Sequence, residues 1–531
     1  MRDFIEKAID NVARFGDTDI FPFDFERHVL FDRRDATVEF LLQLHDNFED
    51  RLNREPPDFI KTLVPVGYTG FRWATKIEPF WNVYYLALVL KIAAGIERER
   101  IPVGQRQVFS YRYAAGQPDG RLFSDCNWRD YRRRAAELAA AHEFVAVTDI
   151  ADFYPRIYHH RIDNAIRRIP GCEVVRSKIL KLLMVFSGSD SYGLPVGGPA
   201  SRLLAELALN DVDQHLNGHR IKFCRYADDY TICAMTKDEA HRALVSLAEK
   251  LSHEGLTLQK SKTRVMTREE YLETVGVLDP CDEPDSARAP EDRLLSISVR
   301  FDPYSPNAAD DYEALRSALR EIDIVGILGR EVAKASIDPA VARHAISAVA
   351  VLDAQQKNGA VRTLLDGENI LVLAPVFLSV MRLIREVYDE LESGSKDYVD
   401  EFLVALYENS SHVLSVDVNL AFYVQALSRR DSNRKREVLI RIYETSRSWL
   451  VRRQVFSAML NLGALFWLRE QKRGFRHLSD LERRSMIVAS YWLSDEGGHW
   501  RRANSPGFTA SECLIRDWFT ERWAVNKTVP M

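Results

Sequence analysis

The chain has 531 residues, 46% of them hydrophobic, which leaves room for about three domains with large cores. Its net charge of −5, from 72 basic and 77 acidic residues, does not by itself suggest a nucleic-acid enzyme. No uninterrupted apolar run approaches the length of a bilayer span, and MRDFIEKAID begins an acidic amphipathic stretch rather than a signal peptide. The composition therefore excludes secreted and membrane proteins and predicts a soluble, cytoplasmic protein.

Cysteine usage points the same way. None of the cysteines forms a C-x-x-C pair, so the sequence indicates neither a zinc site nor a disulfide framework, and reduced buried thiols are expected. The six residues are Cys126, Cys172, Cys224, Cys233, Cys281 and Cys513.

Residues 1–142 are expected to be mainly helical, with one hairpin at Gln105–Tyr113 and its neighbours. This part is interpreted as an N-terminal helical lobe. The next part, 143–278, alternates between the two kinds of element: a strand at Phe144–Ile150, a helix at Arg202–Leu216, a hairpin within Ile221–Met235, a helix at Asp238–His253 and a strand at Thr263–Met266. Such an order predicts a ferredoxin-like βαββαβ sheet.

The hairpin carries the most informative string, Tyr226-Ala227-Asp228-Asp229. Two adjacent carboxylates between runs of β-formers lie on a tight turn, and folding alone gives no reason for that crowding. A divalent cation relieves the repulsion, and oxygen-rich sites suit Mg²⁺ or Mn²⁺. A Tyr-x-Asp-Asp string arises by chance in roughly one chain of this length in twenty, so its context decides.

A second carboxylate on a neighbouring strand supplies the context that this string needs. Phe144–Ile150 ends in Asp149, 79 residues before Asp228, and is expected to lie beside the hairpin in one sheet. Two metal ions held by Asp149 and Asp228 would serve phosphoryl transfer to a primer hydroxyl. Asp152 competes for this role, but it follows the apolar run where a turn begins, and it is interpreted as structural.

The C-terminal part is expected to be helical. Residues 279–308 read as a Pro- and acid-rich linker, and from 309 to 531 amphipathic helices follow one another without strand signals. Helical stretches recur about every 15 to 25 residues, which favours an irregular HEAT-like solenoid over a globular helical domain. The fold class is thus α+β, with a large all-α C-terminal domain.

The basic residues are unevenly spread. From Arg429 to Arg502 there are 17 Lys and Arg against 8 Asp and Glu, so this segment is a candidate for binding phosphate backbones. Solvated faces of surface helices explain the surplus equally well. The residues singled out for nucleic-acid binding are Arg434, Lys435, Arg436, Arg452 and Arg453.

Four blocks resemble the catalytic blocks of reverse transcriptases in order and spacing: TDIADFYPRI (148–157), GLPVGGPASRLLAELAL (193–209), YADD (226–229) and GLTLQKSKT (255–263). Four ordered blocks are far more specific than one. The resemblance implies a right-hand polymerase, with fingers in 1–142 and the palm in 143–278. It also implies that the enzyme uses two Mg²⁺ ions, with Mn²⁺ as an alternative, and takes deoxynucleotides and nucleic acid as partners.

The resemblance also assigns roles to individual residues. Asp149 and Asp228 match the principal metal ligands, with Asp229 supporting them and the carbonyl of Ile150 completing a metal shell. Tyr154 matches the aromatic gate that excludes a 2′-hydroxyl. Three further residues are assigned to substrate binding: Gly197 in the pocket loop, Tyr226, and Lys262 near the triphosphate, for which a solvated lysine is the alternative.

The pocket loop departs from the pattern of the family. Reverse transcriptases usually have Gln after the residue matching Pro195 and Ser after the one matching Gly197, whereas this chain has Val196 and Gly198. A missing polar side chain in the pocket puts ordinary templated nucleotide selection in doubt.

The long helical C-terminus resembles bacterial abortive-infection reverse transcriptases, within the retron and group II-like superfamily. That subgroup implies defence against phage, DNA synthesis without a copied template, priming by a protein hydroxyl with DNA attached covalently, and homo-oligomers. A templated defence or retron-like enzyme copying a noncoding RNA, with RNA as a partner, is the main alternative. An RNA-dependent RNA polymerase and a helical scaffold with a silent palm are weaker ones, because Tyr154 and the full carboxylate set oppose them.

Overall fold

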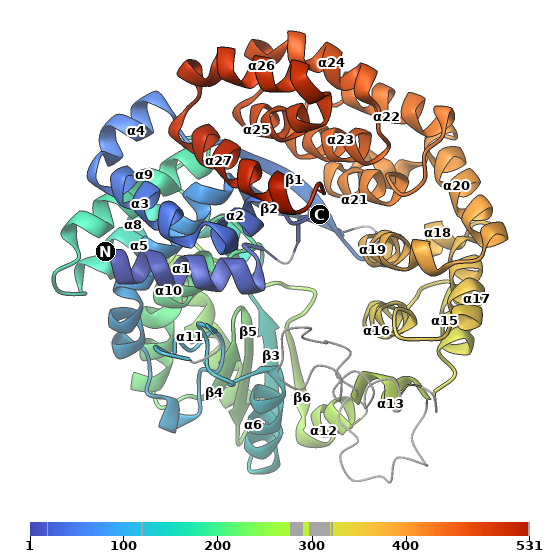
Figure 1. The fold of residues 1–531 in the computed structure, drawn as a ribbon. Coiled ribbons are helices and arrows are strands. Elements are labelled where there is room, and N and C mark those ends of the chain that lie inside the picture. The colour runs from blue at the N-terminus through green and yellow to red at the C-terminus, as the bar shows by residue number, and fades with distance from the viewer. Residues whose placement is uncertain are drawn as a thin grey trace. The chain divides into compact units, whose positions relative to one another are not determined.

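The structure is a computed structural model that describes residues 1–18, 20–68, 70–117, 120–276, 290–296, 319 and 322–528. The chain divides into two compact units, drawn as ribbons in Figure 1. Within the described residues, the first unit comprises 1–61 and 73–276, and the second comprises 62–72 and the residues from 290 onward.

The first unit begins with helices. They are α1 (Arg2–Phe15), α2 (Glu26–Asp32), α3 (Arg34–Asp46), α4 (Phe48–Arg54) and α5 (Pro79–Glu99). The Glu78 carboxylate caps α5 by accepting a hydrogen bond from the Trp81 N–H at 2.6 Å, and Pro79 opens the helix. Among the described residues, α5 alone is long and apolar enough to cross a membrane, but 83% of that window is buried inside the protein. It packs against α1, α9 and α10 as a core helix.

The hairpin predicted at Gln105–Tyr113 and its neighbours is reduced to an isolated antiparallel bridge between Tyr113 and Phe123. Among the described residues, a two-stranded sheet is formed by β1 (Phe59–Val66) and β2 (Gly70–Ile77). The predicted segment also contains a one-turn 3₁₀ helix, η1 (Val103–Gln105), and a parallel bridge from Val108 to Arg225, at the edge of a sheet formed elsewhere in the chain.

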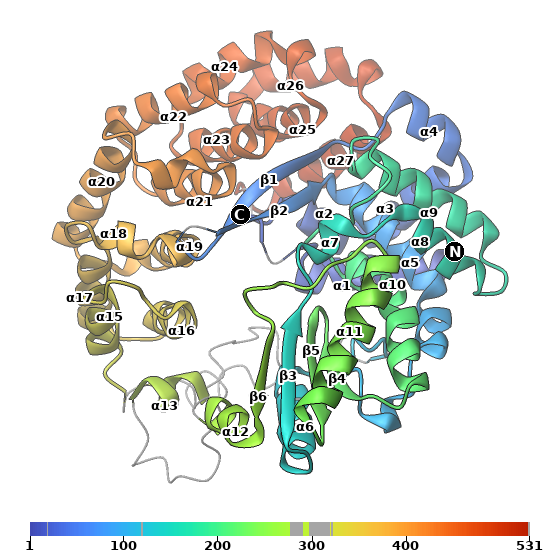
Figure 2. The same ribbon diagram turned by 180° about the vertical axis from the view of Figure 1, so that it is seen from behind.

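The palm sheet is antiparallel, with strand order β4-β5-β3-β6. Its strands are β3 (Phe144–Asp149), β4 (Lys222–Tyr226), β5 (Asp229–Ala234) and β6 (Arg264–Thr267). The crossover helices α10 (Pro199–Gly218) and α11 (Lys237–His253) complete the predicted βαββαβ order, visible in Figure 2. Between β3 and α10 lie α7 (Phe153–Arg156), α8 (His159–Arg167) and α9 (Glu173–Phe186).

Helices cover both faces of this sheet. On one face, α6 (Trp128–Ala140) and α12 (Arg268–Gly276) pack on it, with Tyr131, Val145 and Cys224 in a shared core. On the other face, α10 contacts β4, and α11 contacts β3 and β5. A capping box starts α11, since Thr236 and Glu239 exchange side-chain and backbone hydrogen bonds. The sheet is thereby fixed rigidly under the β4–β5 turn.

The described residues from 290 onward contain helices and turns but no strand. The helices are α13 (Pro290–Ser296), α15 (Ile324–Val332), α16 (Pro339–Val349), α17 (Ala354–Leu365), α18 (Asn369–Val372), α19 (Phe377–Val387), α20 (Ser393–Glu408), α21 (Asp417–Leu427), α22 (Asn433–Thr445), α23 (Trp449–Asn461), α24 (Leu465–Arg473), α25 (Asp480–Ala489), α26 (Ser494–Asn504) and α27 (Ala510–Val525).

These helices stack in two rows, which can be followed in Figure 1. In one row α16, α19, α21, α23, α25 and α27 contact in succession, and in the other row α15, α17, α20 and α22 do so. Polar contacts between successive layers recur at similar sequence spacing. Examples are Lys357 with Glu390 and Arg430 with Asp397, both 33 residues apart, and Arg483 with Glu512, 29 residues apart. The structural repeat is therefore a pair of helices.

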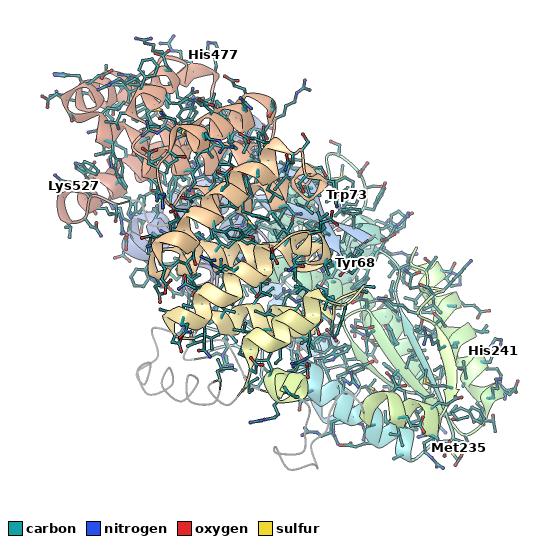
Figure 3. All side chains as sticks on the ribbon, turned by 90° about the vertical axis from the view of Figure 1, so that its right-hand side faces the viewer. Tyr68, Trp73, Met235, His241, His477 and Lys527 are labelled. Carbon is teal, nitrogen blue, oxygen red and sulfur yellow. The ribbon has the colours of Figure 1, made fainter. Side chains whose placement is uncertain are left out.

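Residues 62–72, which form the hairpin tip, group with the second unit. The Tyr68 hydroxyl, labelled in Figure 3, donates a hydrogen bond to the Val372 carbonyl at 2.7 Å and accepts one from the Ile337 N–H at 3.0 Å. A single tyrosine thus satisfies backbone groups at the ends of two helical segments.

Most of the predicted linker 279–308, including Cys281, lies outside the described residues, and within it Pro290–Ser296 forms helix α13. Residues 371–388 do not form one helix but α18, a 3₁₀ turn at Ala374–Val376 and α19. Pro375 causes the break, because proline lacks the N–H that a continuing helix requires.

Candidate active site

The Tyr-Ala-Asp-Asp string forms the turn between β4 and β5, as predicted. Tyr226 ends β4 and Asp229 begins β5, so Ala227 and Asp228 form a two-residue turn. Ala227 has a left-handed backbone with φ +53°, as the tight hairpin connection requires. Asp149 is the direct antiparallel partner of Asp229, and the Ile150 N–H donates to the Asp228 carbonyl at 3.2 Å. The sheet therefore brings the three predicted carboxylates together.

These carboxylates disfavour being ionised together. The pKa of Asp228 is raised to about 7, mainly by burial. The charge of Asp149 and a hydrogen bond with Asp149 contribute to the same shift. Burial and the charge of Asp149 also raise the pKa of Asp229 to about 6. The buried Oδ1 atom of Asp149 has no hydrogen-bond donor among the described residues. Asp149 and Asp228 can pair only if they share a proton or a cation.

Lys262 supplies positive charge at this place. Its ammonium group forms an ion pair with Oδ2 of Asp149, and that hydrogen bond raises the pKa of Lys262. The backbone of Asp149 is fixed from the same side, since its carbonyl accepts a hydrogen bond from the Gln259 N–H at 2.7 Å. Lys262 is 63% exposed at its side chain, so it can move from Asp149 to another anion.

The donor set fits divalent cations, although no cluster of three or more His, Cys, Asp or Glu side chains occurs as a ready-made metal site in the described part of the chain. Hard carboxylate oxygens with raised pKa values and an unsatisfied buried oxygen are what Mg²⁺ would neutralise. Asp152 has an exposed side chain and a left-handed backbone with φ +48° before α7. Its structural interpretation stays a prediction.

Tyr154 lies on α7, four residues beyond Ile150, with its side chain half-buried. Its carbonyl accepts a hydrogen bond from the Leu194 N–H at 2.9 Å, and the Gly193 N–H donates to the Ile157 carbonyl at 2.8 Å. The segment that carries the predicted gate is thus attached to the start of the predicted pocket loop.

The pocket loop packs against the N-terminal segment, a contact that the sequence did not predict. A Cβ atom at Gly197, where φ is +130°, would lie 2.7 Å from Oγ1 of Thr18, and one at Gly198 would lie 3.3 Å from the Asp17 carbonyl. The buried Lys76 holds Asp17 and Asp24 by ion pairs of 2.9 Å each. Glycine at 197 and 198 therefore accommodates the chain's own residues 17 and 18.

A cavity of about 310 Å³ opens beside this contact. It is lined by Asn11, Phe15, Thr18, Arg121, Phe123 and Arg202, among others. Arg202 lies over the ring of Tyr111 at 5.1 Å, and that ring is 6.0 Å from Tyr226. The N-terminal helix is therefore part of the wall of this cavity, which is connected to Tyr226 through Arg202 and Tyr111.

Tyr226 is embedded in aromatic rings. Its centroid lies 5.3 Å from Trp128 in an edge-to-face arrangement and 6.2 Å from Tyr131, and burial raises its pKa to about 12. This tyrosine is held in one orientation beside the turn. This packing was not predicted, and the only sign of it in the sequence is the pair of aromatic residues, Trp128 and Tyr131, in α6.

Shortening the gate residue is expected to change sugar selection. Tyr154→Val removes the ring that would meet a 2′-hydroxyl, so the ratio of ribonucleotide to deoxynucleotide incorporation should rise about 10- to 100-fold. The control is Tyr154→Phe, which keeps the ring and should leave the ratio near the wild-type value. Competition assays with labelled nucleotides measure it. A wild-type enzyme that prefers ribonucleotides would contradict the assignment.

The five basic residues predicted to bind nucleic acid all have partners inside the helical unit. Arg434 bonds Glu401 and Glu408 at 2.9 and 2.8 Å, and Arg436 pairs with Asp431 at 2.7 Å. The others are deeper: Lys435 is 1% exposed beside Asp400, Arg452 bonds Glu482, and Arg453 is buried near Ser485. The burial of Lys435 and Arg453 fits neither phosphate binding at the surface nor a solvated helix face, and nucleic-acid binding by the exposed members stays a prediction.

The arrangement of the first unit is that of a nucleotidyltransferase with a polymerase palm. The family model described as "Reverse transcriptase (RNA-dependent DNA polymerase)" matches residues 104–287, so this part is an RNA-directed DNA polymerase-like domain. A curated relative, the Retron Ec86 reverse transcriptase of Escherichia coli, is 24% identical over 139 residues. The match covers 25% of this chain and spans less than half, 42%, of the relative.

Two solved structures are also matched, both with a TM-score of 0.30. One is apo telomerase from Candida tropicalis, with 10% identity, covering 71% of this chain and 72% of that one. The other is telomerase from Candida albicans in complex with a fragment of telomeric RNA, with 11% identity, covering 77% and 68%.

Proposed function

We propose that the chain is a phage-defence DNA polymerase of the abortive-infection type that joins deoxynucleotides without copying a template. The observation that carries the chemistry is the meeting of Asp149 and Asp228, two carboxylates that need a shared proton or cation, on a rigid sheet. Asp149, Asp228 and the Ile150 carbonyl would hold two Mg²⁺ ions, with Asp229 in support. When bound, these ions would neutralise phosphate charge and lower the pKa of the attacking hydroxyl.

Side chains of the protein would bind and orient the nucleotide. Lys262 would exchange Asp149 for a triphosphate oxygen, because its side chain is exposed and both partners are anions. The ring of Tyr154 would lie under the sugar and exclude a 2′-hydroxyl. Gly197 leaves space in the loop, and Tyr226 supports the turn from the side of the aromatic cluster. Together these residues orient a nucleotide for in-line attack.

The N-terminal segment supports the untemplated part of the proposal. Asp17 covers Gly198, one of the two positions where family members carry a polar residue, and Thr18 covers the neighbouring Gly197, while an ion pair with Lys76 holds Asp17. A template base that needed this space would have to displace a buried charged contact, which is costly. Selection by the protein is therefore favoured over selection by a template.

The helical unit supports the finer assignment. Its stacked helix pairs are consistent with a HEAT-like solenoid, which could hold an extended product strand. Priming by a hydroxyl of the protein, covalent attachment of the DNA, homo-oligomerisation and a cytoplasmic location belong to the same proposal. The domain limits proposed are 1–142, 143–278, 279–308 and 309–531.

A second candidate is a retron-like enzyme that copies an associated noncoding RNA. The similarity to the retron reverse transcriptase favours it. The two candidates differ in whether an RNA is required and in whether the DNA product stays attached to the protein.

The test is to incubate purified protein with labelled deoxynucleotides and Mg²⁺, with and without added RNA, and to analyse the products before and after protease digestion. Product that forms without RNA and migrates with the protein until digestion is expected. Asp149→Asn serves as the inactive control. Free, protease-insensitive DNA made only with RNA would move the chain to the retron-like class.

A further inference from the structure

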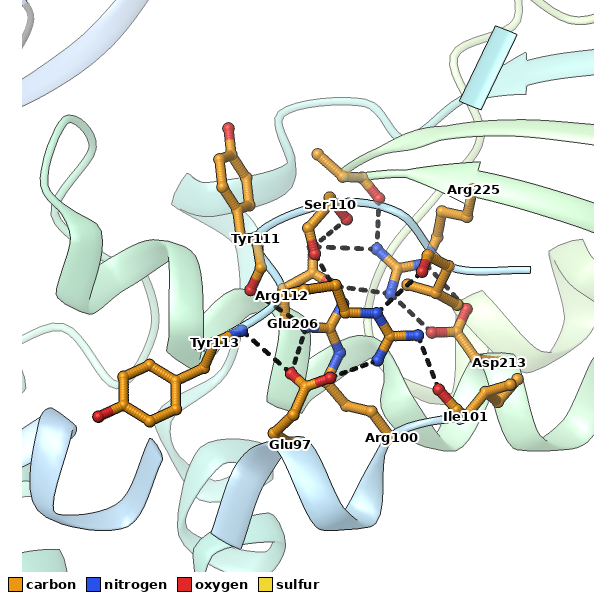
Figure 4. A network of polar contacts seen from close by, with 12 residues as sticks. Glu97, Arg100, Ile101, Ser110, Tyr111, Arg112, Tyr113, Glu206, Asp213 and Arg225 are labelled. Carbon is orange, nitrogen blue, oxygen red and sulfur yellow. Dashed lines mark hydrogen bonds and ion pairs between the residues drawn. The ribbon is translucent and has the colours of Figure 1, made fainter. Parts of the chain in front are cut away.

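A cluster of three arginines and three carboxylates lies buried beside the YADD turn, as Figure 4 shows. Its members are Arg100, Arg112, Arg225, Glu97, Glu206 and Asp213. Their charges balance, and except for Glu97 at 22% every side chain is at most 3% exposed. Burying so many charges is costly and does not by itself stabilise a fold. Such a cluster calls for a reason other than stability.

Glu206 on α10 is the centre of the cluster. One of its oxygens accepts from Arg100 at 2.6 Å and Arg225 at 2.8 Å, and the other accepts from the Ser110 hydroxyl at 2.6 Å. Although burial opposes ionisation, the two guanidinium groups hold the pKa of Glu206 below its ordinary value. Asp213 lies seven residues further along α10. Its carboxylate accepts hydrogen bonds from Nε and Nη2 of Arg225 at 2.9 and 2.6 Å.

Each of the two arginines on Glu206 also holds a carbonyl of a left-handed residue. Arg225 Nη1 donates to the Ala227 carbonyl at 2.8 Å, and Arg100 Nη1 donates to the Tyr111 carbonyl at 3.1 Å. Ala227 has φ +53° and Tyr111 has φ +45°. Left-handed backbone is costly for residues other than glycine, so it persists where surrounding contacts fix it.

Both fixed residues adjoin the candidate active site. Ala227 immediately precedes Asp228, and the ring of Tyr111 contacts that of Tyr226 and lies under Arg202 at the cavity wall. Glu206 is therefore connected, through one arginine each, to the turn that carries Asp228 and to the residue whose ring lies beside it.

We infer that Glu206, Arg225 and Arg100 form a positioning unit that sets the YADD turn and Tyr111 for catalysis. None of the three touches a reacting atom. The unit fixes where the Asp228 carboxylate lies relative to Asp149, and a shift of about 1 Å there can cost about 10²-fold in rate. This inference rests on the proposed nucleotidyl transfer.

The test is Arg225→Lys, which keeps the charge but loses the planar fork that reaches Glu206, Asp213 and Ala227 together. The expected result is a fall in kcat of about 10²-fold, with little change in KM for the nucleotide, and a higher Mg²⁺ concentration for half-maximal rate. Hydrogen exchange of the amides at 227–229 should become faster, and this measurement does not depend on activity.

Arg112→Lys is the matched control. Arg112 is equally buried and has as many acceptors (Glu97, Val108 and Ile101), but it bonds no residue of the turn. It should lose comparable thermal stability while keeping exchange at 227–229 and the Mg²⁺ dependence unchanged. If Arg225→Lys does not fold, Ser110→Ala replaces it, since this variant removes one donor to Glu206 and leaves every charge paired.

Equal effects of Arg225→Lys and Arg112→Lys on exchange and on Mg²⁺ dependence would overturn the inference. For Ser110→Ala, the outcome against it is exchange at 227–229 indistinguishable from wild type. Failure of the proposed function looks different. In that case the wild-type protein incorporates no nucleotide, while the exchange measurements still report whether the cluster fixes the turn.

Discussion

Asp228→Asn is expected to reduce deoxynucleotide incorporation by at least about 10³-fold while leaving the first unit folded. Asparagine keeps the size of the side chain and removes the charge that, with Asp149, would balance divalent cations at the reacting phosphate. Single-turnover incorporation of a labelled nucleotide measures the loss. Asp149→Ala and Asp228→Ala should be inactive in the same assay.

The same substitution is expected to stabilise the metal-free protein at pH 8. Burial and the neighbouring Asp149 raise the pKa of Asp228 to about 7, whereas an aspartate in an unfolded chain ionises near pH 4. The folded state therefore binds more protons between these values, and the stability of the wild type falls as pH rises from about 4 to 7. Asparagine removes this penalty, so its free energy of unfolding should be higher by about 1–3 kcal/mol at pH 8.

The control is Asp238→Asn on α11. Asp238 is 74% exposed and pairs only with the exposed Arg242, so this variant should change neither incorporation nor the pH dependence. Thermal melts at pH 5 and pH 8 compare the three proteins. An Asp228→Asn variant that is active, or that is less stable than wild type at pH 8, would contradict the role assigned to this carboxylate.

The palm could be predicted because its signals are local. The apolar run ending at Asp149 becomes β3, the β-formers around Ala227 become the β4–β5 hairpin, and Asp238–His253 coincides with α11 within one residue. Alternation and capping residues act over a few positions, so the sequence displays them directly. The order of the four sequence blocks then suffices to predict that Asp149 and Asp228 lie close together.

The contacts around the site join residues that are far apart in the sequence, and they were not predicted. Thr18 reaches Gly197 across 179 positions of the chain, a contact that no periodicity encodes. The charged cluster left a weaker trace: Glu206 and Asp213 lie seven residues apart within the apolar stripe of a helix, and Arg225 interrupts a strand of β-formers. Charges at positions whose neighbours are buried signal a paired interior cluster, but they do not reveal the partners.

The basic surplus of the helical unit shows the same limit. Counting charges between 429 and 502 leaves out the acidic residues of α20, which lie outside that window. Asp397, Asp400 and Glu401 precede their arginine and lysine partners by about 33 residues, one structural repeat. Part of the surplus of positive charge counted along the sequence is therefore neutralised in the folded protein by acidic residues of α20.

Reversing the charge of Lys435 is expected to unfold the helical unit under mild conditions. Its side chain is 1% exposed, and its ammonium group forms an ion pair with Asp400 and donates to the Arg430 carbonyl at 3.1 Å. Lys435→Glu would place a second carboxylate against Asp400 in the interior, where breaking a pair costs about 3–5 kcal/mol. Urea denaturation followed by circular dichroism measures this loss.

The neighbouring residue separates a structural role from nucleic-acid binding. Arg434 is 51% exposed and bonds Glu401 and Glu408 at the surface, so Arg434→Glu should cost no more than about 1 kcal/mol. If the exposed basic residues contact a DNA product, Arg434→Glu weakens binding of single-stranded DNA and reduces its salt dependence without loss of stability. Unchanged binding would assign Arg434 to the surface of the repeat alone. Equal stability of the Lys435→Glu and Arg434→Glu variants would contradict the buried ion pair, because the two side chains differ in burial and not in charge.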